Sequence, residues 1–214
     1  MELFDTTTAG LVARKLLEIK AIKLQPHQPF TWASGWKSPI YCDNRLSLSF
    51  PKVRSLIKEK LVKVLQEKFQ RVEAVAGVAT AGIPQGVLLA DALDLPFLYV
   101  RSKTKGHGME NRIEGKVTAG QKVVVVEDLV STGGSSLKAV NDLRESGVDV
   151  LGMVAIFTYG FGIASENFEK AGVKLICLSD YESMLPQAIE ESYVSDSDLT
   201  SLTSWRKDPG NWGK

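Results

Sequence analysis

The apolar positions of this chain follow a helical period in some segments and form unbroken runs in others. In residues 8–20 and 52–69, apolar side chains recur every three or four positions, which predicts two amphipathic helices. Three threonines at the start of the first segment are placed to cap that helix. Two more helices are predicted over residues 83–92 and 135–145, and Gly147 stops the second of them.

The unbroken apolar runs are short and lie between or after these helices. Runs without alternation are typical of parallel strands that are buried on both faces. The four successive valines at positions 123–126 are accommodated most easily in a central strand. The predicted strands cover residues 74–79, 96–101, 121–126, 150–158 and 173–178. Their alternation with helices predicts an α/β fold, with a central parallel sheet of about five strands flanked by helices.

Two segments do not follow this alternation. Residues 24–51 are dense in proline, glycine, serine and aromatic residues, which predicts loops and short strands that cover another part of the molecule. After residue 180 serine and aspartate are frequent, and we expect this tail to pack at the surface or to fray. The simplest interpretation is one domain over residues 1–214, made of a small N-terminal hood (about 20–50), a core (about 52–180) and a C-terminal tail (181–214).

The composition excludes several classes of protein. The 26 Lys and Arg residues nearly balance the 25 Asp and Glu residues, so the net charge of +1 indicates neither a nucleic-acid partner nor a membrane surface. Cys42 and Cys177 lack the spacing of a metal or redox pair, and we expect both to be reduced and buried. No apolar run reaches the length of a membrane span, and the first ten residues lack a secretory pattern, so we expect a cytoplasmic protein.

The segment VVVVEDLVSTGGSS carries the strongest chemical signal. Ligands of open parallel sheets gather at the carboxyl ends of the strands, where this segment places Glu127 and Asp128. The backbone N–H groups of residues 131–135 can form a cup for a phosphate, because Gly133 and Gly134 carry no side chain and a helix begins there. The two acids could accept hydrogen bonds from ribose hydroxyls on the other side of the same ligand.

Other interpretations of this segment remain open. The acids could simply end a strand, and the glycines could simply permit a tight turn before a capped helix. The chain has neither the G-x-x-x-x-G-K-[ST] motif of nucleoside triphosphatases nor a G-x-G-x-x-G motif after a strand, which argues against both of those enzyme classes.

A basic segment, residues 101–116, follows the second predicted strand. It contains Arg101, Lys103, Lys105, His107, Arg112 and Lys116. One interpretation is a solvated connection. The combination of clustered positive charge with glycines favours a lid that closes over a polyanion. Lys105 and His107 are two positions apart, so they would share one face of an extended loop.

Four motifs together resemble one known family. VVVVEDLVSTGG resembles the motif that binds phosphoribosyl pyrophosphate (PRPP) in type I phosphoribosyltransferases, and RSKTKGHG followed by EG resembles the flexible catalytic loop of their orotate-specific members. FTWASGWKSPIYCDNR is similar to the amino-terminal hood of those members, and GVATAGIP is similar to their pyrophosphate loop. The resemblance covers roughly residues 8–180, with the motifs in the same order.

This resemblance implies a glycosyltransferase of the type I phosphoribosyltransferase fold. Its reaction would join orotate to the ribose 5-phosphate of PRPP, giving orotidine 5'-phosphate and pyrophosphate in UMP biosynthesis. The resemblance also implies a magnesium ion (Mg2+) carried by PRPP without direct protein ligands. It further implies a homodimer whose active sites are shared between subunits, with no nucleic acid and no membrane as partner.

The resemblance also assigns site residues by position. The catalytic residues would be Lys105, His107 and Asp128. PRPP would be bound by Arg101, Lys103, Lys105, His107, Glu127, Asp128, Leu129, Val130, Ser131, Thr132, Gly133, Gly134 and Ser135. Orotate would be bound by Ser131, Tyr41 and Lys37. Trp32 and Trp36 could stack on the base or pack the hood onto the core, and the sequence leaves both interpretations open.

The chain departs from some members of the family at charged positions. Ser102, Ala33 and Ala81 stand where those members have lysine, and Tyr159 stands where they have the arginine that binds the orotate carboxylate. We hypothesise that Lys37, Arg45 or backbone N–H groups around Ser34 bind that carboxylate here. Two further hypotheses are a phosphoribosyltransferase for another base and a non-catalytic PRPP sensor that binds nucleic acid. The hood motif argues against the first, and the balanced charge and the basic loop argue against the second.

Overall fold

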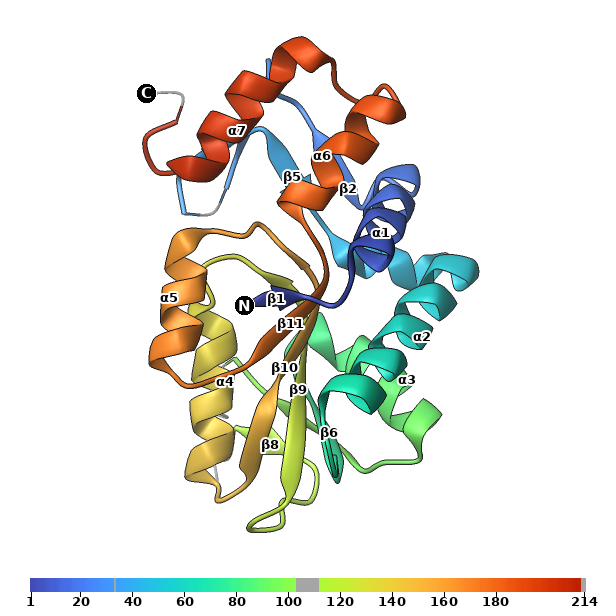
Figure 1. Ribbon diagram of the computed structural model, residues 1–214. Coiled ribbons are helices and arrows are strands. Elements are labelled where there is room, and N and C mark those ends of the chain that lie inside the picture. Colours follow the sequence, from blue (N-terminus) through green and yellow to red (C-terminus); the bar gives the residue numbers. More distant parts are fainter. Residues whose placement is uncertain (33, 103–111, 213–214) are drawn as a thin grey trace.

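A seven-stranded sheet forms the centre of the molecule in the computed structural model, which describes residues 1–32, 34–102 and 112–212 (Figure 1). The strands lie in the order β1-β11-β10-β9-β6-β7-β8, and every neighbouring pair is parallel except β7 and β8. Their bounds are β1 Glu2–Leu3, β6 Ala74–Val78, β7 Phe97–Val100, β8 Ile113–Glu114, β9 Lys122–Val130, β10 Asp149–Thr158 and β11 Leu175–Asp180. All five predicted strands are present, and the two additional strands are edge strands of two residues each.

Helices cover both faces of the sheet (Figure 1). Three of them, α1 (Thr6–Glu18), α2 (Pro51–Lys68) and α3 (Gly82–Leu93), lie on one face. The opposite face is covered by α4 (Gly134–Glu145) and α5 (Gly162–Lys170). The four helices predicted from the apolar period are therefore confirmed to within about two residues at each end, which is the usual uncertainty of helix ends.

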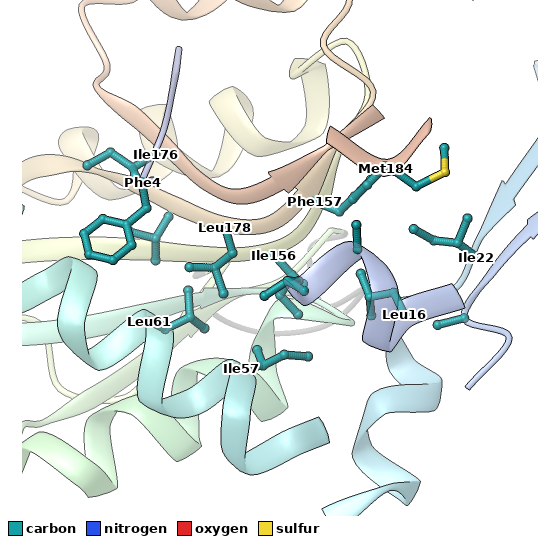
Figure 2. Packing of buried hydrophobic residues seen from close by; sticks show 14 of the residues in the cluster. Phe4, Leu16, Ile22, Ile57, Leu61, Ile156, Phe157, Ile176, Leu178 and Met184 are labelled. Carbon is teal, nitrogen blue, oxygen red and sulfur yellow. The ribbon is translucent and has the colours of Figure 1, made fainter. Parts of the chain in front are cut away.

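The two faces of the sheet are packed by two separate hydrophobic clusters. Because side chains of a strand point alternately to opposite faces, Val124 and Val126 belong to one cluster and Val123 and Val125 to the other. All four valines are fully buried, as predicted for a central strand. Figure 2 shows the larger cluster, where Leu61 of α2 lies against side chains of the central sheet.

The hood consists of two small antiparallel sheets and a 3-10 helix. Strand β2 (Ile22–Leu24) pairs with β5 (Ile40–Cys42), and β3 (Phe30–Thr31) pairs with β4 (Lys37–Ser38). The 3-10 helix η1 (Asn44–Ser49) then leads into α2. A hairpin of two-residue strands has little stability of its own. The hood therefore depends on side chains such as Ile22 and Ile40, which are buried in the same cluster as α1 and α2.

The segment after residue 180 is helical, so the expectation that it frays is wrong for most of it, while many of its side chains remain exposed at the surface. It forms α6 (Tyr181–Glu190), the 3-10 helix η2 (Asp196–Asp198) and α7 (Leu199–Lys207). Leu202 and Trp205 of α7 are fully buried. In Figure 1 these helices lie beside the hood strands, above the carboxyl ends of the central strands. The two helices are short and amphipathic, and their apolar positions are too few to be recognised in a serine-rich sequence without the structure.

Single residues determine where α1 begins and where α4 ends. The side chain that caps α1 is Asp5, which accepts hydrogen bonds from the backbone nitrogen and hydroxyl of Thr8, at 2.6 and 2.8 Å. The preceding aspartate, and not a threonine, therefore caps this helix. Gly147 adopts a φ of 88° just after α4, which confirms it as the residue that ends that helix. Among the described helices, none combines the length and the apolar composition that a membrane crossing requires.

Candidate active site at the carboxyl edge of the sheet

The acidic pair lies near the carboxyl end of β9, under the hood. Glu127 is only 6% exposed, and its carboxylate accepts hydrogen bonds from the Ser136 hydroxyl at 3.0 Å and from the Asp128 backbone nitrogen at 3.1 Å. Burial raises the pKa of Glu127 well above its ordinary value, and the neighbouring Asp128 charge raises it further. Burial also raises the pKa of Asp128. The pair therefore holds protons more readily than exposed carboxylates do, which reduces its repulsion of an approaching phosphate.

The turn from β9 into α4 has the geometry of an anion cup. Gly133 has a φ of 83°, and a Cβ atom on it would lie 2.7 Å from the Phe168 ring. On Gly134, by contrast, the nearest neighbour of an added Cβ would be the Thr132 hydroxyl at 4.0 Å. The side of Gly134 that a Cβ would occupy is therefore open. The first N–H groups of α4 have no partner within the helix, so they are available to a phosphate in this open space.

Asn44 ties the hood to the strand that carries the acids. This residue is 1% exposed, and its side-chain amide nitrogen donates to the backbone oxygen of Asp128 at 2.7 Å. The Cys42 thiol donates to the Asn44 side-chain oxygen at 3.3 Å. Ser47 donates to the Asn44 backbone oxygen at 2.7 Å, and Gln85 of α3 donates to the Ser47 hydroxyl at 3.3 Å. This buried polar chain fixes the distance between the hood and the acidic pair.

A hollow of about 280 Å³ lies between the hood and the carboxyl edge. Its lining residues are Thr31, Trp32, Tyr41, Cys42, Leu129, Ser131 and Tyr159. The hollow brings together two of the predicted orotate ligands, Tyr41 and Ser131. Trp32 lines it and also packs on Tyr159, with the ring centroids 4.9 Å apart. This confirms that Trp32 packs the hood onto the core, whereas its stacking on the base stays a prediction. A planar ring bounded by aromatic walls and a few hydroxyl groups suits this space.

The cationic residues predicted for the orotate carboxylate lie outside this lining. The Lys37 ammonium donates to the Thr31 hydroxyl at 2.8 Å, so it lies one residue away from the hollow. Arg45 donates two hydrogen bonds to Asp43, at 2.6 and 2.9 Å. The Lys37 assignment therefore stays a prediction, and Arg45 would have to leave Asp43 before it could bind a substrate.

A second, smaller hollow of about 80 Å³ joins three of the predicted motifs. It is lined by Ala79 of the segment similar to a pyrophosphate loop, by Arg101 at the start of the basic segment, and by Ser135 of the cup. Arg101 donates to Glu114 of β8 at 3.4 Å. The side chains of Lys138 and Asp142 of α4 complete the charged wall.

Three predicted loop residues, Lys103, Lys105 and His107, lie outside the described residues. Among the remaining predicted PRPP ligands, Leu129 and Ser131 line the larger hollow, and Arg101 and Ser135 line the smaller one. The Val130 side chain is instead fully buried in the cluster on the other face of the sheet, so only its backbone could contact a ligand. In the described ranges, no three His, Cys, Asp or Glu side chains gather as a metal site would require. Asn44 and the α7 residues behind the hollow were not predicted from the sequence, since their contacts join positions far apart in the chain.

Comparisons with known proteins place this geometry in a family. Residues 48–180, more than half of the chain, match the sequence model of the family described as phosphoribosyl transferase domain. The orotate phosphoribosyltransferase of Cytophaga hutchinsonii is 57% identical over 203 residues, which cover 95% of this chain and 97% of that protein. The orotate phosphoribosyltransferase of Porphyromonas gingivalis is 58% identical over 207 residues, which cover 97% of this chain and 99% of that protein.

Solved structures give the same result. The crystal structure of orotate phosphoribosyltransferase from Aeropyrum pernix is similar with a TM-score of 0.74 at 33% identity, over 82% of this chain and 97% of that chain. The structure of Leishmania donovani UMP synthase is similar with a TM-score of 0.76 at 25% identity, over 92% of this chain and 42% of that chain.

Proposed function

Since the chain belongs to the orotate phosphoribosyltransferases of the phosphoribosyl transferase domain family, we propose that it joins orotate to the ribose 5-phosphate of PRPP. The products are orotidine 5'-phosphate, a precursor of UMP, and pyrophosphate. The observation that carries this proposal is the meeting of an acidic pair, an open phosphate cup and an aromatic hollow at one edge of the sheet.

The cup and the acidic pair would hold the ribose 5-phosphate between them. The 5-phosphate would occupy the open space beside Gly134, where N–H groups of α4 point outward. The ribose hydroxyls would then donate to Glu127 and Asp128. A hydroxyl donor binds an ionised carboxylate better than a protonated one, so PRPP binding would release protons from this pair.

The hollow would hold orotate with its ring nitrogen directed at the anomeric carbon. The new bond joins that nitrogen to the anomeric carbon, the electrons of the old C–O bond leave with pyrophosphate, and the N–H proton of the ring passes to water or to the departing pyrophosphate. The negative charge of orotate at neutral pH lies on its carboxylate, so this proton still has to leave as the bond forms. Tyr41 and Ser131 are the proposed polar contacts of the base, with Lys37 close enough to approach its carboxylate.

Departure of pyrophosphate is the more demanding part of the reaction. Negative charge develops on the leaving group, and preorganised positive groups stabilise it best. Arg101 lines the smaller hollow and could take this role if its guanidinium left the Glu114 carboxylate and bound the pyrophosphate. Lys103, Lys105 and His107 are proposed to join it from the basic segment, which would close over the site and exclude water.

We propose that the magnesium ion is carried by PRPP without direct protein ligands. Magnesium takes oxygen ligands and keeps several waters, so phosphate oxygens of the substrate and water can supply its coordination. Glu127 and Asp128 lie at the same edge of the sheet and are left to bind the ribose hydroxyls. When bound, the ion would neutralise pyrophosphate charge. We further propose a cytoplasmic homodimer in which the basic segment of each subunit serves the site of its partner.

The test is substrate choice. We expect the protein, given PRPP and magnesium, to consume orotate and to leave adenine, hypoxanthine and uracil unchanged. The measurement is the loss of orotate absorbance, together with chromatography of the other bases. Asp128→Asn serves as the control for background reaction, since it keeps the shape of the site and removes one charge. Comparable turnover of any purine would overturn the orotate assignment.

A further inference from the structure

Trp205 of α7 lies directly behind the aromatic wall of the larger hollow. The residue is fully buried. Its ring centroid lies 5.6 Å from that of Trp32, 5.8 Å from that of Tyr159, 5.4 Å from that of Phe161 and 5.2 Å from that of Tyr181. Trp32 and Tyr159 line the hollow, and Trp205 does not. One side chain from the C-terminal segment therefore contacts two walls of a pocket that it does not enter.

Polar contacts attach α7 to the same two walls. The Trp205 indole nitrogen donates to the backbone oxygen of Lys37 in β4, at 3.2 Å. The neighbouring Arg206 donates to the backbone oxygen of Gly160 at 3.3 Å and pairs with Glu182 at 3.5 Å. The helix thus holds the β3–β4 hairpin on one side and the segment after β10 on the other.

Each wall also has a support other than α7, and the first is a hydrogen bond from the Trp32 indole nitrogen to the Ile40 backbone oxygen at 3.1 Å. The β3–β4 hairpin has two residues in each strand, and such a hairpin is marginal without packing. Tyr159 follows the end of β10, and its backbone nitrogen still donates to the Val130 oxygen of β9 at 3.3 Å. The phosphate cup, by contrast, is held by β9, α4 and the Phe168 ring, which belongs to the cluster on the other face of the sheet. A change in α7 should therefore reach the hollow and spare the cup.

We propose that Trp205 is a positioning residue for base recognition. It sets the separation of Trp32 and Tyr159, and hence the affinity of the hollow for orotate, without contacting the substrate. The inference rests on the proposed function of the hollow as the base site. Its distinguishing consequence is that kinetic constants for orotate change while those for PRPP do not.

The experiment compares Trp205→Ala and Trp205→Phe with Leu202→Ala as the matched control. Leu202 is on the same helix and equally buried, but its side chain has neither a ring nor a hydrogen-bond donor. We expect Trp205→Ala to raise the KM for orotate roughly tenfold or more, because misplacement of a binding wall by about 1 Å has effects of this order. The KM for PRPP should change less than about twofold by the same reasoning, since the cup keeps its own supports.

The conservative variant and the control decide between positioning and general stability. Trp205→Phe keeps a ring and loses the hydrogen bond to Lys37, so its KM for orotate should lie between those of wild type and Trp205→Ala. Leu202→Ala should lower the melting temperature and keep the wild-type KM for orotate. Should Trp205→Ala fail to fold, an unchanged orotate KM in a folded Trp205→Phe overturns the inference.

Two other outcomes would also overturn it. Equal increases of the orotate KM in the Leu202 and Trp205 variants would mean that α7 acts only through overall stability. Parallel increases of the orotate and PRPP constants would mean that Trp205 does not act on the hollow in particular. Failure of the wild-type protein to use orotate at all is a separate result, which removes the proposed function and this inference together.

Discussion

At the scale of single residues, the site places two carboxylates where water cannot solvate them well. Glu127 is nearly buried and lies next to Asp128, and burial is the main reason that the pKa of each is raised. An arrangement of this kind costs stability in the free protein, because a charged group prefers water. The cost is expected at a binding site, where the substrate supplies the missing hydrogen-bond donors.

The stability of Glu127→Gln should show this cost. Because the folded-state pKa of Glu127 lies above its ordinary value of 4.5, the folded protein binds more protons than the unfolded chain between these two values. Wild-type stability therefore falls as pH rises through that window, and glutamine removes this loss. Its amide oxygen can still accept from the Asp128 backbone nitrogen, while its amide nitrogen donates to the Ser136 hydroxyl, which turns to accept. At neutral pH we expect a melting temperature a few degrees above wild type, since each kcal/mol shifts it by roughly 2–4 °C in a chain of this size.

The measurement is thermal unfolding of wild type and variant from below pH 4.5 to pH 8. The difference should vanish at the acid end, where wild-type Glu127 is protonated in both states. The exposed Glu59 on α2 provides the control, and Glu59→Gln should leave the melting temperature unchanged throughout. A constant difference between Glu127→Gln and wild type at every pH would show that ionisation of Glu127 is not the cause.

Sequence reasoning identified the residues whose chemistry is local and missed those whose role depends on distant contacts. Glu127, Asp128 and the glycine turn were recognisable because a strand, two acids and a small-residue turn follow one another. Asn44 was not, since its amide binds the backbone oxygen of a residue 84 positions away. No residue spacing within the hood predicts that contact, because it forms only when the hood folds against β9.

At the scale of elements, the turn from β9 into α4 contains two adjacent glycines with different requirements. Gly133 has a left-handed backbone, and a side chain on it would collide with the Phe168 ring. Gly134, by contrast, has open space where a side chain would be. The first glycine is therefore required by the fold, and the second by whatever occupies the open space.

Two substitutions separate these requirements. Gly134→Val should leave the protein folded and weaken PRPP binding at least roughly tenfold, since each hydrogen bond to a charged group contributes about 1.5–3 kcal/mol. Gly133→Ala should destabilise the protein by about 1–3 kcal/mol, through backbone strain and overpacking against Phe168. Calorimetric titration with PRPP and thermal unfolding of both variants test this pair. Unchanged PRPP affinity in folded Gly134→Val would locate the phosphate elsewhere.

The elements themselves were predictable where a long period was available. The valine-rich strand and the amphipathic helices follow from the order of apolar residues alone. Strands β1 and β8 have two residues each, too few to show any period. Helix α6 contains Pro186 in its interior, and α7 lies within a serine-rich stretch, so local propensity argues against both. Burial of Tyr181, Leu202 and Trp205 outweighs that propensity.

At the scale of the whole molecule, the proposed sharing of sites in a homodimer can be tested by mixing two inactive variants. Lys105→Ala removes a loop residue, and Asp128→Asn removes a pocket residue. If each loop serves the partner's pocket, a mixed dimer combines one intact loop with one intact pocket and places both defects in its other site. About half of the dimers are mixed after random exchange, so activity should return to roughly a quarter of wild type for a two-fold symmetric dimer.

The measurement is PRPP-dependent loss of orotate after equal amounts of the two variants are refolded together. Each variant refolded alone is the control, and subunit exchange is established independently with a mass tag on one variant. If loops served their own pockets, every site would carry one defect. Mixing would then restore no activity despite proven exchange, and the shared site would be refuted.

The hood and α7 lie far apart in the sequence, so they leave the ribosome at different times. Trp205 and the hood residue whose backbone it binds are 168 positions apart. Because translation proceeds from the amino end, the hood emerges early, and α7, which packs against it, is added only when almost the whole chain has been made. The phosphate cup between β9 and α4 can be complete well before that moment. During each round of synthesis, the residues of the proposed phosphate cup therefore emerge before the last support of the proposed base site.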